Sequence, residues 1–129
     1  MQVDKETNRR ADSRTVHPRR VLLIDDDREI LELLAEWLRG RGHEVRTLAD
    51  GACAVAEARA FRPDVVVLDG VLRGTTGVAV AQRLRQEKLG CGIVFLSGLN
   101  RAELPLTEVV LEKPIDLQAL EHAILMASA

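Results

Sequence analysis

The residues of this chain best suited to chemistry are acids that directly follow short apolar runs. The stretch VLLIDDD places Asp25, Asp26 and Asp27 after four apolar residues, and DVVVLD ends on Asp69. Two carboxylates about 5 Å apart repel each other by roughly 3 kcal/mol at an effective dielectric constant of ~20. A cation would offset this repulsion, and a set of carboxylate oxygens suits a hard ion such as Mg²⁺, which keeps several waters. The acids therefore predict a cation site if the fold brings them together.

A hydroxyl group and an amine follow two later apolar runs. GIVFLSG places Ser97 near its end, and EVVLEKP brings Lys113 directly after a strand-like run. A carboxylate can attack a phosphorus centre only where the incoming negative charge is neutralised, and Mg²⁺ together with an ammonium group would do this. The residue types therefore favour chemistry on a phosphoryl group.

The segments that must position these side chains alternate between strand and helix patterns from Arg20 onward. Runs rich in Val, Ile and Leu predict strands, and apolar residues at helical spacing predict helices. The expected strands are 20–25, 43–48, 64–69, 92–97 and 108–112, and the expected helices are 28–40, 50–61, 77–88 and 116–127. Parallel strands need crossover helices, so this order predicts an α/β fold with an open, doubly wound, five-stranded parallel sheet. Ligands bind at the carboxyl ends of such strands, which is where these polar residues lie.

The sequence resembles the receiver domain of the two-component response regulators over residues 20–127. The resemblance rests on four motifs in the same order: LLIDDD, PDVVVLDG, FLSG and LEKP. It implies a flavodoxin-like sheet with strand order 2-1-3-4-5 and a cis bond before Pro114. It also implies a role for each site residue: Asp69 as phosphoacceptor, Ser97 binding a phosphoryl oxygen, Lys113 pairing with Asp69 or its phosphate, and Mg²⁺ held by Asp25, Asp26, Asp69 and the Val71 carbonyl.

The function implied by the resemblance is that of a phosphorylation-activated receiver in a phosphorelay. The donor would be a phosphohistidine on a sensor histidine kinase or a phosphotransfer protein, and the signal would pass to an unidentified protein by contact. Such a domain catalyses its own phosphorylation and is not a turnover enzyme. It would be a stand-alone receiver or a piece of a larger regulator or hybrid kinase, and the N-terminal segment favours the first.

Two departures from the family pattern affect how the signal would leave the domain. Between Ser97 and Lys113 the chain is shorter than usual and contains Pro105, which predicts a shortened or missing fourth helix. Val110 stands where an aromatic switch residue is usual. The leucines at 99, 104 and 106 would either form a substitute partner surface or fold back over the sheet edge.

Further departures lie close to the phosphoacceptor. Arg73 stands where a proline is usual and Thr76 where an acid is common. Val71 and Leu99 follow Asp69 and Ser97 by two residues. Because apolar side chains cannot orient an attacking water, they predict slow loss of the phosphoryl group.

Composition limits the setting of the domain. A chain of 129 residues with 47% hydrophobic content supports one core. Residues 1–19 lack hydrophobic periodicity and predict a flexible tail ahead of the domain at 20–127. The tail is basic, but neither interleaved aromatic residues nor a helix-turn-helix pattern accompanies it, so we expect no nucleic acid partner. Without an apolar stretch near ~18 residues or a signal-like N-terminus, we expect no membrane contact and a cytoplasmic location. The oligomeric state stays open.

Several residues also have plain structural interpretations. Asp27 is expected to cap the helix that follows it, and Asp50 the next one. An aspartate-nucleophile phosphatase normally needs a second acid two residues from its nucleophile. This chain has Val67 and Val71 at those positions, which argues against such a phosphatase. A nucleotide site would need a Gly-rich loop after the first strand, and the acids at that position argue against one. A receiver-like module that acts without phosphorylation stays open as the alternative. The sequence predicts surface positions for His17, His43 and His122 and buried free thiols for Cys53 and Cys91.

Overall fold

The computed structural model of this chain describes residues 14–98 and 108–128. Its centre is a five-stranded sheet in the order β2-β1-β3-β6-β7. The strands are β1 (Arg20–Ile24), β2 (Glu44–Leu48), β3 (Val65–Asp69), β6 (Gly92–Ser97) and β7 (Val109–Glu112). All four neighbouring pairs are parallel. The predicted flavodoxin-like sheet, counted 2-1-3-4-5 over its long strands, is confirmed.

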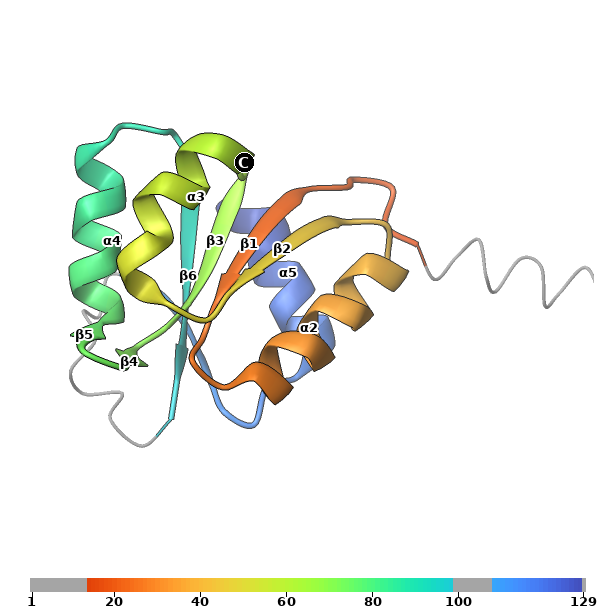
Figure 1. The fold of residues 1–129 in the computed structure, drawn as a ribbon. Coiled ribbons are helices and arrows are strands. Elements are labelled where there is room, and N and C mark those ends of the chain that lie inside the picture. Colours follow the sequence, from red (N-terminus) through yellow and green to blue (C-terminus); the bar gives the residue numbers. More distant parts are fainter. Residues whose placement is uncertain (1–13, 99–107, 129) are drawn as a thin grey trace, which may run out of the picture.

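Helices cover both faces of this sheet (Figure 1). The helices α2 (Arg28–Gly40) and α5 (Leu117–Ala127) pack on one face, and α3 (Ala54–Phe61) and α4 (Gly77–Gln86) pack on the other. Successive residues of a strand point to opposite faces, so Val21 and Leu23 belong to the first core cluster while Leu22 and Ile24 belong to the second. Burial on both faces is the reason why the central strands are continuous apolar runs.

Side-chain caps begin the helices where the sequence places small polar residues. The Asp27 carboxylate accepts from the backbone N–H groups of Glu29 and Ile30, which confirms its predicted capping role. Asp50 caps a short 3₁₀ segment, η1 (Gly51–Cys53), that leads into α3. Each carboxylate satisfies N–H groups that have no partner within the helix.

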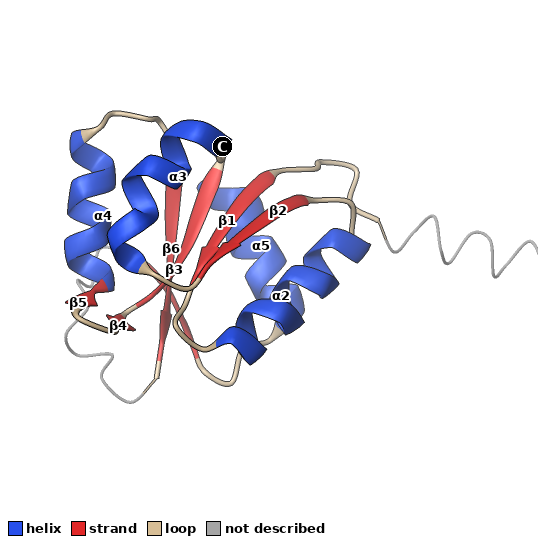
Figure 2. Ribbon diagram, in the orientation of Figure 1, coloured by secondary structure: helices blue, strands red, loops and turns tan. Residues whose placement is uncertain are grey.

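A short antiparallel hairpin follows β3 and was not predicted from the sequence (Figure 2). It consists of β4 (Val71–Leu72) and β5 (Thr75–Thr76), with Leu72 paired to Thr75. The two-residue turn Arg73–Gly74 joins them, and Gly74 has a φ of +76°. Leu72 is buried in the core, so the hairpin is anchored to the domain.

Three predictions about single side chains are wrong. His43 was expected on the surface but is buried, because it directly precedes β2 and its ring lies between the Arg19 backbone and Glu121. Cys53 was expected to be buried but is exposed where η1 meets α3, and Cys91, just before β6, is only partly buried.

Some predictions cannot be compared with the described part of the chain. The shortened fourth helix and the surface formed by Leu99, Leu104 and Leu106 fall outside the described residues. The boundary at residue 20 stays a prediction, although Thr15 donates a backbone hydrogen bond to Arg41 and Arg19 accepts one from Glu44. None of the helices formed by the described residues is long and apolar enough to span a membrane.

Candidate functional site

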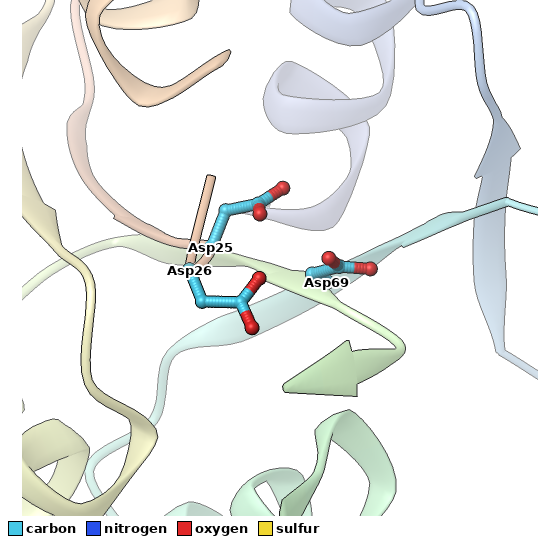
Figure 3. A group of neighbouring side chains, drawn as sticks. All are labelled: Asp25, Asp26 and Asp69. Atoms are coloured by element: carbon cyan, nitrogen blue, oxygen red, sulfur yellow. The ribbon is translucent and has the colours of Figure 1, made fainter. Parts of the chain in front are cut away.

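Three aspartates meet where β1 and β3 end. Asp25 directly follows β1, Asp26 comes next, and Asp69 is the last residue of β3. The two strands are neighbours in register, with Ile24 opposite Leu68, so their carboxyl ends lie at the same level. One carboxylate oxygen from each aspartate lies within 4.8 Å of the other two. Figure 3 shows the three side chains gathered at this edge of the sheet.

Lys113, which directly follows β7, contacts two of these acids. Its Nζ lies 3.2 Å from Asp25 Oδ2 and 3.3 Å from Asp69 Oδ2. The Lys113 backbone N–H donates to the Ser97 carbonyl at 2.7 Å, which fixes the start of the side chain beside β6. The peptide bond between Lys113 and Pro114 is cis, as the resemblance implied. The predicted contact with Asp69 is confirmed, and the contact with Asp25 is additional.

The electrostatics of the site are dominated by burial. The Asp25 side chain is 2% exposed and that of Asp69 is 11% exposed. Burial, followed by the negative charge of Asp25, raises the pKa of Asp69, against the opposing effects of Lys113 and of the Val71 backbone N–H. Burial acts to lower the pKa of Lys113, but Asp25 and Asp69 together raise it above its ordinary value. One ammonium group therefore compensates the acids only in part.

The acid set fits a divalent cation. Mg²⁺ binds oxygen atoms at about 2.0–2.1 Å, so opposite ligands of the ion lie about 4.2 Å apart. One oxygen of each of the three carboxylates lies within 4.8 Å of the other two, so the three groups are close enough to share one ion. Asp25, Asp26 and Asp69 are therefore the residues that would hold the ion. The role of the Val71 carbonyl as a fourth ligand stays a prediction. The backbone N–H of Val71 donates to Asp69 Oδ1 at 3.3 Å.

Ser97 lies at the same edge of the sheet but does not contact the acids. It is the last residue of β6, which pairs with β3 so that Asp69 lies opposite Leu96. Its side chain is buried, and Oγ donates to the Gly98 carbonyl at 3.4 Å. Among the described residues, no hydrogen bond joins the Ser97 hydroxyl to an acid of the site. The structure thus brings together four of the predicted residues, with Ser97 one strand away.

The loop after Asp69 is held against the sheet by close backbone contacts. Gly70 donates to the Leu96 carbonyl and Gly77 donates to the Gly70 carbonyl, both at 2.9 Å. A Cβ atom added at Gly77 would come within 2.3 Å of the Asp69 carbonyl oxygen, so only glycine fits there. These contacts fix the position of Asp69 relative to the hairpin.

A hollow opens beside the acids between the hairpin and the start of α2. It is lined by Asp26, Asp27, Arg28, Glu29, Ala49, Asp50 and Arg73. Sequence reasoning identified Arg73 only as a departure from a family pattern, not as part of the site. No local signal identified it, because the tip of the hairpin meets α2 and the loop after β2 only in the folded chain.

Comparison with known proteins agrees with this geometry. The family model described as the response regulator receiver domain matches residues 21–125. The chain is 39% identical over 95 residues to the probable transcriptional regulatory protein TcrX of Mycobacterium tuberculosis, covering 74% of this chain and 39% of that protein. It is 40% identical over 78 residues to the DNA-binding response regulator MtrA of Mycolicibacterium paratuberculosis, covering 60% of this chain and 34% of that protein. The chain therefore spans less than two fifths of the length of these relatives.

A solved structure shows the same fold. The crystal structure of a putative response regulator from Chloroflexus aurantiacus superimposes with a TM-score of 0.76 at 29% identity, covering 87% of this chain and 98% of that one. The sheet order and the strand-end acids are thus found in a chain that resembles known receivers along most of its length.

The comparisons correct the prediction about partners. We expected no nucleic acid partner because the basic segment at residues 1–19 lacks a recognisable binding pattern. That exclusion is wrong, because relatives of this chain are named as DNA-binding response regulators and the chain covers only 34% of their length. The residue pattern of one short segment is therefore not enough to exclude a nucleic acid partner.

Proposed function

This chain belongs to the response regulator receiver domain family, and from that membership we propose that it accepts a phosphoryl group on Asp69 and passes on a signal when it does so. The observation that carries the proposal is the Asp69 carboxylate itself. It lies at the end of β3 with Lys113 Nζ at 3.3 Å and with oxygens of Asp25 and Asp26 close by. This arrangement holds a nucleophile beside an ammonium group and beside two carboxylates that would bind Mg²⁺, and these two cations would neutralise the charge of a phosphoryl group.

The reaction we propose is the displacement of a leaving group from phosphorus. A carboxylate oxygen of Asp69 forms a bond to phosphorus while the bond to the donor breaks, and the leaving group takes that electron pair. For a phosphohistidine donor the leaving group is the imidazole nitrogen. Lys113 remains beside Asp69 and can then pair with an oxygen of the attached group. Mg²⁺ bound by the three acids would supply further neutralisation of negative charge.

The attached phosphoryl group is the proposed signal. It adds about −1.5 to −2 of charge and strong acceptor oxygens to a buried edge of the sheet. Ser97, one strand away with its hydroxyl on the Gly98 carbonyl, is the proposed hydrogen-bond donor to those oxygens. Turning Ser97 toward Asp69 would release this contact at the start of the segment that follows β6.

The proposed output is contact with another protein, as the resemblance implied. The MtrA relatives are named as DNA-binding response regulators. We therefore also propose that this domain acts as the phosphorylation-dependent part of a regulator that binds DNA. We propose that each chain phosphorylates itself once and does not act as a turnover enzyme. The cytoplasmic location stays a prediction.

Intact-mass measurement tests the proposed function directly. We expect incubation with phosphoramidate and Mg²⁺ to add the mass of one phosphoryl group to the folded chain, and we expect a chelator to prevent it, because the acids repel the donor without a cation. A folded protein that binds Mg²⁺ and gains no mass would contradict the proposal. That outcome would favour the alternative, a receiver-like module that acts without phosphorylation.

The side chain two residues after Asp69 is expected to control the lifetime of the phosphoryl group. Val71 begins the hairpin strand β4 and is 52% exposed, so its side chain borders the solvent that must supply an attacking water. Valine cannot hydrogen-bond to that water, whereas asparagine can orient it. We expect Val71→Asn to lose the phosphoryl group several-fold faster than the wild type, as measured by intact mass after removal of the donor. Slower loss in Val71→Asn would contradict this explanation.

A further inference from the structure

The hairpin after Asp69 places one arginine in a hollow that also contains Asp26, one of the three acids of the site. Arg73 occupies the turn between β4 and β5, four residues after Asp69. The hairpin base is held by the hydrogen bond from Gly77 to the Gly70 carbonyl, and its middle by buried Leu72. A Cβ atom added at Gly51 would come within 3.0 Å of Leu72 and 3.2 Å of Thr75, so the hairpin also packs tightly against η1. The backbone of Arg73 is therefore held in place.

The surroundings of Arg73 are acidic. The hollow that it lines contains four acids, Asp26, Asp27, Glu29 and Asp50, and one other cation, Arg28. Asp27 and Asp50 already accept backbone hydrogen bonds as helix caps. Within residues 14–98 and 108–128, the Arg73 side chain forms no ion pair or hydrogen bond. Arg73 is thus a cation that lies in the same hollow as these four acids without pairing with any of them.

We propose that Arg73 binds the phosphoryl group of the incoming donor, an inference that rests on the function proposed for Asp69. A doubly charged phosphoryl group must enter an opening where acids repel it, and a guanidinium group can offer two parallel N–H donors to its oxygens. Arg73 lies on the hairpin that follows the nucleophile, four residues after Asp69, and it lines the same hollow as Asp26. The ligand class is a phosphoryl group with a small leaving group, whether acyl or imidazole.

The rate of phosphorylation at two salt concentrations tests this assignment. We expect Arg73→Gln to lower the second-order rate constant for phosphorylation by acetyl phosphate about tenfold at low salt, the equivalent of about 1.4 kcal/mol. The loss should shrink near 1 M salt, where the screening length falls to about 3 Å. Arg73→Lys should keep only part of the rate, because lysine retains the charge but not the two parallel N–H donors. The matched control is Arg83→Gln, which removes an exposed arginine of α4 that does not line the hollow.

Binding of Mg²⁺ separates donor recognition from damage to the site. Removing a positive charge from the opening should leave the affinity for Mg²⁺ unchanged or raise it, as measured by titration calorimetry without any donor. A parallel fall in Mg²⁺ affinity and in phosphorylation rate would overturn the proposal, because it would mean that the acids themselves had moved.

A second donor identifies the group that Arg73 contacts. Phosphoimidazole carries the same phosphoryl group as acetyl phosphate on a different leaving group. A similar loss with both donors supports contact with the phosphoryl group, whereas a loss with acetyl phosphate alone assigns Arg73 to the acyl group and overturns the proposal. An Arg73→Gln rate equal to that of the wild type at low salt also overturns it. If the wild type itself gains no phosphoryl group, the function proposed for Asp69 has failed instead.

Discussion

Asp69→Asn is expected to abolish the phosphoryl adduct completely, because the amide has no negative oxygen with which to attack phosphorus. The substitution preserves shape, and asparagine can still accept from Lys113 Nζ, which lies 3.3 Å from Asp69 Oδ2. Intact-mass analysis after incubation with phosphoramidate and Mg²⁺ measures the effect. An adduct that persists in Asp69→Asn would place the acceptor elsewhere in the chain.

The matched control for this variant is Asp27→Asn. Asp27 lies at the same end of the sheet, but its carboxylate caps α2 through the N–H groups of Glu29 and Ile30. Asparagine caps a helix about as well as aspartate. Asp27→Asn should therefore still gain one phosphoryl group, at a rate equal to or higher than that of the wild type, because Asp27 also lines the acidic hollow beside Arg73.

A stability measurement distinguishes loss of the nucleophile from loss of the fold. Burial and the neighbouring Asp25 raise the pKa of Asp69, so its ionised form destabilises the folded protein as the pH rises past the ordinary value for aspartate. Removing this charge should leave the free energy of unfolding at neutral pH unchanged or raise it by about 1 kcal/mol. An inactive but equally stable Asp69→Asn protein would confirm that the effect is chemical.

Glu121→Ala is expected to lower the free energy of unfolding of the domain by about 3 kcal/mol. The Glu121 side chain, on α5, is 10% exposed and contacts Arg41 and His43. This contact lies at the opposite end of the sheet from the three aspartates. Its Oε1 lies 2.8 Å from Arg41 Nη2, and its Oε2 lies 2.9 Å from His43 Nε2. The Arg19 backbone N–H donates to His43 Nδ1, so the imidazole must donate to Glu121 from Nε2. Without Glu121, that buried N–H loses its acceptor.

The expected loss depends on pH in a defined direction. Burial acts to raise the pKa of Glu121, but the hydrogen bonds from Arg41 and His43 outweigh it and lower the pKa below its ordinary value of 4.5. The stabilisation by ionised Glu121 is thus fully present above pH 4.5 and is lost as the pH falls through the lowered value. The difference between wild type and Glu121→Ala in urea unfolding should therefore be largest at neutral pH and shrink in acid.

Two further variants test this explanation. Glu32→Ala removes an exposed glutamate from α2 and should change stability by less than about 0.5 kcal/mol. Glu121→Gln keeps an acceptor for His43 but not the charge, so its loss should be smaller than that of Glu121→Ala. Equal unfolding free energies for wild type and Glu121→Ala at neutral pH would contradict the predicted contribution.

The sequence by itself determined the sheet and the acid cluster. The run DVVVLD predicts a strand buried on both faces, because a central parallel strand has no solvent side, and β3 is buried from Val65 to Asp69. Parallel strands end at one edge of the sheet, so the position of an acid directly after such a run is enough to place it there. Asp25, Asp26 and Asp69 were therefore predictable without any knowledge of their contacts.

The tertiary structure alone decided which side chains touch. Lys113 reaches Asp25, 88 positions away, a contact that was not predicted from the sequence. His43 meets Glu121 across 78 positions, and neither residue shows a pattern that would distinguish it from a surface residue. Arg73 joins the acidic opening because a hairpin packs against Gly51. Local patterns report burial and strand ends, because those depend on neighbouring residues in the chain. Contacts between distant segments depend on sheet register, on helix packing and on the close approach of backbone segments. These exist only once the whole domain has folded.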